Sequence, residues 1–176
     1  MKKIVALILI VISLFTLTKR KEEILIPDAA IRFRVIANSD AKVDQDIKML
    51  VKNDIESEVL NDIKGSNSIN ETRTIIKDNL PQYEEVVFNT LRKNNIDQDF
   101  NINYGMNYFP EKTYKGVKYP SGEYESLVVT LGNGEGKNWW CVLFPPLCLL
   151  EAEEEEESNE VEYKFFVREL IDKFFN

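Results

Sequence analysis

Residues 137–150, KNWWCVLFPPLCLL, constrain the fold of this chain more than any other segment. They hold both tryptophans and both cysteines of the 176-residue sequence, together with a double proline. Residues 139–146 carry no charge, whereas 30% of the whole chain is charged, so this segment must be buried in the fold or bound to a partner. On a strand, Trp139 and Trp140 point to opposite faces of the sheet.

Two interpretations of this segment stay open. It forms a central strand covered on both faces, or it leaves one aromatic face as a docking surface for a partner. Cys141 and Cys148 bring a second pair of alternatives, because a turn at Pro145 and Pro146 can bring one thiol back toward the other. They form a disulfide, which an exported protein can keep, or they are two buried thiols.

The chain has no histidine, and this absence excludes several classes of enzyme. Ser-His-Asp and Cys-His triads, HExxH metalloproteases and His-containing zinc sites all need an imidazole. No DTG or DSG triplet of an aspartic peptidase occurs either. The glycine-rich residues 132–136 lack the first glycine and the Ser or Thr of a phosphate-binding loop, so we expect a hairpin connection there. The sequence therefore predicts no catalytic residue, cofactor or metal site.

The charge distribution argues against nucleic acid as a partner. Five of the 22 basic side chains lie in the first 21 residues, which contain none of the 30 acidic ones, so the remainder carries a net charge of −13. Phosphate contacts need clustered Lys and Arg, and no such cluster follows residue 21.

The first 21 residues have the pattern of a targeting segment. Lys2 and Lys3 precede an apolar run at residues 4–17. As a helix, this run is roughly 21 Å long, shorter than the ~30 Å hydrocarbon core of a membrane. Its length favours a signal peptide, whereas the lack of an A-x-A cleavage site favours a short membrane anchor. Both alternatives place the following domain outside the cytoplasm.

The next segments alternate between strand and helix patterns. Residues 31–37, IRFRVIA, alternate apolar and polar positions as a half-buried strand does. Asn38, Ser39 and Asp40 follow as turn and helix-cap residues, and apolar residues recur at helical spacing over residues 43–59.

Two further helices are expected before the chain returns to strands. Ser68 and Glu71 can form a capping box for the first of them. Pro81 predicts a kink or a fresh helix start, with an apolar stripe over residues 83–91.

Strand patterns return at residues 100–106 and 124–131, with a short strand within residues 114–119. Glu125, near the start of the second run, could approach Arg32 or Arg34 if the two strands are neighbours. Residues 151–162 hold eight acids and no base, and an amphipathic helix over residues 161–175 must dock on the domain, on a partner or on a membrane.

These patterns predict an α+β fold, with two or three helices on one face of a mainly antiparallel sheet and a C-terminal amphipathic helix. The expected organisation is a signal peptide or anchor at residues 1–21, a signalling domain at residues 22–150, and an acidic linker with a helix at residues 151–176.

Three strings of the sequence resemble the stage II sporulation protein R family. They are IPDAAIRFRVIANSD, FPEKTYKGVKYPSGEYESL and GKNWWCVLFPPLC, and the VEYKFFVRELI tail matches more weakly. The resemblance covers residues 26–60 and 109–149. It implies an exported signalling protein that acts between the forespore and mother-cell membranes. There it would activate a membrane-embedded aspartic peptidase, which processes pro-sigma-E in the mother cell.

We expect such a protein to bind its partner through exposed turns and aromatic side chains. The candidate binding residues are Asn38, Ser39, Asp40, Tyr119, Tyr124, Trp139 and Trp140. Two rival functions are an envelope enzyme with a cysteine nucleophile and a structural envelope protein.

N-terminal sequencing of the mature protein distinguishes a signal peptide from an anchor. Because the apolar run is short, we expect a mature chain that begins after residue 17. Recovery of a chain that still begins at Met1 would show that the segment is retained as an anchor.

Overall fold

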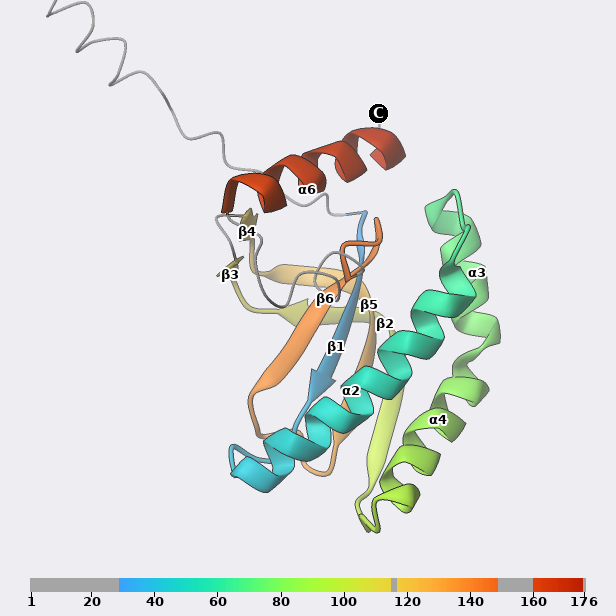
Figure 1. The fold of residues 1–176 in the computed structure, drawn as a ribbon, viewed down its shortest axis with the longest axis vertical. Coiled ribbons are helices and arrows are strands. Elements are labelled where there is room, and N and C mark those ends of the chain that lie inside the picture. The colour runs from blue at the N-terminus through green and yellow to red at the C-terminus, as the bar shows by residue number, and fades with distance from the viewer. Residues whose placement is uncertain (1–28, 115–116, 149–159, 176) are drawn as a thin grey trace, which may run out of the picture.

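The computed structural model describes residues 29–114, 117–148 and 160–175 (Figure 1). The predicted targeting segment at residues 1–21 and the acidic residues 151–157 lie outside these ranges. The elements, in chain order, are β1 (Ile31–Ile36), α2 (Lys42–Ile63), α3 (Ile69–Asp78), α4 (Leu80–Lys93), β2 (Phe100–Phe109), β3 (Lys112–Tyr114), β4 (Val117–Tyr119), β5 (Gly122–Leu131), β6 (Asn138–Phe144) and α6 (Glu160–Phe175).

The main sheet has four strands in the order β2-β5-β1-β6. β1 pairs in parallel with β5, while the β1–β6 and β2–β5 pairs are antiparallel. Helices α2, α3 and α4 lie on one side of this sheet, and α6 lies across one end near the small β3–β4 hairpin (Figure 1). The predicted α+β class, the mainly antiparallel sheet and the C-terminal helix are confirmed.

Two apolar clusters lie on opposite faces of the sheet, as strand alternation requires. Phe33, Val35 and Leu127 join the main core beneath the three helices. The second cluster contains residues of β2, β4, β5 and β6 and is closed by Val167 of α6, which is fully buried. The amphipathic C-terminal helix therefore docks on its own domain.

The local signals for the middle helices act as expected. The Ser68 side chain accepts a hydrogen bond from the Glu71 backbone N–H at 3.2 Å, so the helix α3 begins with the predicted cap. Pro81 lies in the first turn of α4, which makes this helix a fresh start after Asn79.

The prediction of a hairpin at residues 132–136 is wrong. The strands on either side of this loop, β5 and β6, are not neighbours, because β1 lies between them. The loop crosses the end of β1 instead. There the Glu135 and Gly136 backbone N–H groups donate to the carbonyls of Asn38 (3.1 Å) and Ala37 (2.9 Å). A Cβ on Gly136 would collide with the carbonyl oxygen of Ser39, so only glycine allows this close crossing.

Glu125 binds a helix residue, not Arg32 or Arg34. It lies on the helix-covered face with Leu127, whereas the two arginines of β1 lie on the other face. Arg73 of α3 donates to both Glu125 carboxylate oxygens, from Nε at 2.9 and 2.8 Å, and Tyr104 donates to one at 2.9 Å. Partial burial opposes ionisation of Glu125, but these hydrogen bonds outweigh it and hold its pKa below the ordinary value.

The Glu125→Gln variant should lower the free energy of unfolding by about 1 kcal/mol near pH 7. Because the folded state lowers the pKa of Glu125, the stabilisation is fully present above the pKa of the unfolded state. It is lost as the pH falls through the lower folded value. Urea denaturation at pH 7 and at about pH 3 should therefore show a difference from wild type that shrinks in acid. Glu123→Gln, an exposed carboxylate on the same strand, is the control and should match wild type at both pH values. Equal stability of Glu125→Gln and wild type at pH 7 would contradict this assignment.

Candidate functional site

The turn Asn38-Ser39-Asp40 follows β1, where its polar side chains hold neighbouring segments together. Asn38 Nδ2 and Ser39 Oγ both donate to Asp44 Oδ2, at 3.0 and 2.5 Å, near the start of α2. Asp40 Oδ1 accepts from the Lys137 backbone N–H at 2.7 Å. These contacts give the predicted binding turn a structural role. Asp40 is exposed, whereas Asn38 and Ser39 are half-buried.

Trp139 lies on the helix-covered face of β6 and is half-buried. Its ring packs edge-on against Phe33, with the centroids 5.8 Å apart, and Lys52 Nζ lies 4.4 Å from its centroid. Lys52 also forms an ion pair with Glu56 at 2.6 Å. Trp139 thus packs against a nearly buried ion pair.

Trp140, Tyr119 and Tyr124 come together on the opposite face, around the buried guanidinium of Arg32. The Arg32 Cζ atom lies 3.3 Å from the Tyr124 ring centroid and 5.2 Å from that of Trp140. Tyr119 meets Trp140 edge-on with centroids 4.8 Å apart, and Phe109 completes this aromatic cage. Aromatic faces attract a cation, and this attraction strengthens where water is excluded.

The two tryptophans do point to opposite faces, but neither is broadly exposed, since Trp140 is only 7% exposed. Arg32 is 0% exposed and was missed as the centre of the cage. Its signal was weak, because an arginine at an alternating strand position is read as solvent-facing. Its surroundings come from residues far along the chain, namely Phe109, Tyr119, Tyr124 and Trp140.

Cys141 and Cys148 form a disulfide in the structure, with Cα atoms 5.4 Å apart. Both residues are buried in the main core. Glu56 Oε1 lies 3.9 Å from Cys141 Sγ, and the three side chains are the one group of this kind in the described residues with metal-ligand geometry. Sulfurs joined in a disulfide offer neither a metal-binding nor a nucleophilic thiolate.

The seven predicted binding residues therefore do not form one surface. Tyr119, Tyr124 and Trp140 line the aromatic cage, Trp139 lies across the sheet, and the turn at residues 38–40 lies at the far end of β1. The separation of Trp139 from Trp140 follows from the alternation of β6, which sends neighbouring side chains to opposite faces.

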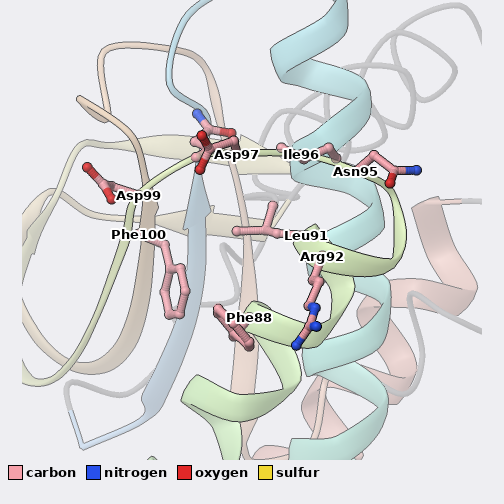
Figure 2. A pocket seen from close by; sticks show the side chains of 9 residues that line it. Phe88, Leu91, Arg92, Asn95, Ile96, Asp97, Asp99 and Phe100 are labelled. Carbon is pink, nitrogen blue, oxygen red and sulfur yellow. The ribbon is translucent and has the colours of Figure 1, made fainter.

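A groove with a mixed polar and apolar lining, which sequence reasoning missed, lies between α4 and the start of β2 (Figure 2). Its cavity has a volume of about 580 Å³, with Phe88 and Leu91 on one wall and Phe100 on the other. Asp97 and Asp99 lie at one end. Of the charge-free string FNINYGMNYF, only Phe100 lines the cavity, so the sequence held little signal for this groove.

No helix in the described residues is long and apolar enough to cross a membrane. The part of the chain outside them is not covered by this finding.

A family model for stage II sporulation protein R matches residues 27–154, which include every strand of the sheet. The chain belongs to this family. It is also 41% identical over 155 residues to stage II sporulation protein R of Bacillus subtilis (strain 168), covering 84% of this chain and 69% of that protein. No solved structure matches the chain. The resemblance seen in the three sequence strings is thus confirmed, and a role in sporulation follows from it.

Replacing Cys141 and Cys148 together by alanine should lower the free energy of unfolding by about 2.5 kcal/mol. Without the disulfide, the unfolded chain is no longer held in a short closed loop, so its conformational entropy rises. Urea denaturation with and without a thiol reductant measures this loss. Reductant should destabilise the wild type and leave the double variant unchanged. A wild type that is insensitive to reductant under unfolding conditions would show that no disulfide forms.

Proposed function

We propose that the chain is an exported sporulation signal that activates a membrane-embedded aspartic peptidase, which then processes pro-sigma-E in the mother cell. Membership of the stage II sporulation protein R family carries this proposal, through 41% identity over most of the chain. The signal acts in the space between the forespore and mother-cell membranes. The apolar run at residues 4–17 supports export, and its retention would anchor the signal to a membrane.

The chemistry of the domain supports a binding role better than catalysis. The sequence contains no histidine, and both cysteines are held in a buried disulfide. The rival with a cysteine nucleophile needs a thiolate that solvent can reach. A ligand without catalytic groups can still activate an enzyme, by binding its active state more tightly than its inactive state.

The structure leaves only some of the predicted binding residues accessible to a partner. Of the predicted residues, Asp40 is exposed and Asn38, Ser39 and Trp139 are half-buried, while Tyr119, Tyr124 and Trp140 support the fold from within the aromatic cage. The partner is a protein and not a nucleic acid, because the domain carries a net negative charge.

Co-production of this chain with the candidate peptidase and pro-sigma-E, in a host without other sporulation proteins, tests the proposal. We expect cleavage of pro-sigma-E on an immunoblot only when the full-length chain carries its N-terminal segment. A chain without residues 1–21 stays in the cytoplasm and should give no cleavage, which makes it the matched control for export.

Absence of cleavage with all three proteins present at wild-type levels would contradict the proposed activation. Cleavage that persists with Cys141→Ala and Cys148→Ala together would remove the thiol enzyme as a rival. A purely structural envelope protein should give no cleavage in any combination.

A further inference from the structure

We propose that the outer edge of β2 binds an extended segment of the partner protein by strand addition. This inference rests on the proposed function, because it takes the membrane-embedded peptidase as that partner. In strand addition, backbone hydrogen bonds supply affinity, and alternate side chains of the added segment supply specificity.

The backbone of β2 is available on its outer side. β2 is the last strand of the sheet order, and no strand in the described residues pairs with its other edge. The Gly132 N–H donates to the Asp99 carbonyl at 2.7 Å, which places the pair 99–132 among those bonded to β5. Since bonded and non-bonded pairs alternate in an antiparallel ladder, Phe100, Ile102, Tyr104 and Met106 direct their N–H and C=O groups outward.

This edge lacks the usual protection against pairing with another chain. Proteins block exposed edges with charged side chains, proline or very short strands. β2 is 10 residues long and contains neither a charged residue nor a proline, although 30% of the chain is charged. Met106 is 65% exposed on this strand.

The groove beside the edge can accept side chains of the added strand. Phe88 of α4 is 52% exposed and faces the cavity that Phe100 lines from β2 (Figure 2). The outward backbone groups belong to the residues whose side chains lie on this helix-covered face. A segment paired with β2 would therefore direct every second side chain toward this face. The side chain beside Phe100 would lie at the groove, where an apolar one can contact Phe88 and Phe100.

Charge favours a different protein over a second copy as the occupant. The chain beyond residue 21 carries a net charge of −13, so two copies repel each other. Among the groove residues, the exposed carboxylates Asp97 and Asp99 outnumber the single cation Arg92. The matching segment is extended and apolar at alternate positions, with a Lys or Arg at the end that meets these two carboxylates.

Two surface variants test the edge directly, with the purified candidate peptidase in lipid nanodiscs as the probe. Met106→Pro removes an outward N–H that β5 does not use, and Phe88→Glu places a charge in the groove. Each should weaken binding about tenfold or more. Val43→Glu, at a residue of α2 that is 63% exposed and outside the groove, is the matched control and should bind within about twofold of wild type. Hydrogen exchange should slow at the amides of Ile102, Tyr104 and Met106 when the peptidase is added.

The outcomes separate this inference from the proposed function. If the wild type binds and activates the peptidase, but both variants do so equally well and the three amides stay unprotected, only the strand-addition site is overturned. If the wild type neither binds nor activates the peptidase, the proposed function is contradicted, and the peptidase is not the partner of the β2 edge. If sedimentation shows a wild-type dimer that Met106→Pro dissociates, the occupant is a second copy and the proposal is overturned.

Discussion

The position of β1 between β5 and β6 is the constraint on which the rest of this structure depends. All six residues of this strand pair with β6 in the antiparallel direction, and five of them also pair in parallel with β5. Because both partners come from the last third of the described domain, the sheet closes only after the chain has passed through three helices. The same position forces the loop after β5 to cross the end of β1. There the Asn38-Ser39-Asp40 turn accepts hydrogen bonds from the backbone of the loop.

The two faces of β1 then define two environments with different chemistry. Phe33 and Val35 enter the main core beside the disulfide and the Lys52–Glu56 ion pair. Arg32, on the other face, is enclosed by aromatic rings and capped by the cluster that contains Val167 of α6. A buried guanidinium is costly to desolvate, so the aromatic rings and the docked helix depend on each other. Most of the unusual residues of the sequence thus stabilise the domain, and the accessible apolar surface lies elsewhere, along β2 and α4.

Some of this arrangement was predictable, because it depends on short-range rules. The alternation in IRFRVIA, the Ser68 cap and the helix start at Pro81 each involve residues within one or two turns of each other. The surroundings of the candidate binding residues were not predictable in this way. Tyr119, Tyr124 and Trp140 were chosen as binding residues, but they are buried together in the cluster that also contains Val167 of α6. The predicted partner of Glu125 and the predicted hairpin at residues 132–136 were wrong for the same reason. Each prediction assumed the wrong neighbouring element.

The sequence by itself determined the class of fold, the opposite directions of Trp139 and Trp140, the lack of imidazole chemistry and, through three long strings, the family. These properties depend on composition, on side-chain periodicity or on identity at many positions. Only the tertiary structure decided that β1 separates β5 from β6, that Arg32 lies in an aromatic cage, and that β2 is left as an open edge. Strand order is set by the burial of both faces of the whole sheet at once. The free-energy difference between alternative strand orders is spread over many distant contacts, so no single segment of the sequence predicts it.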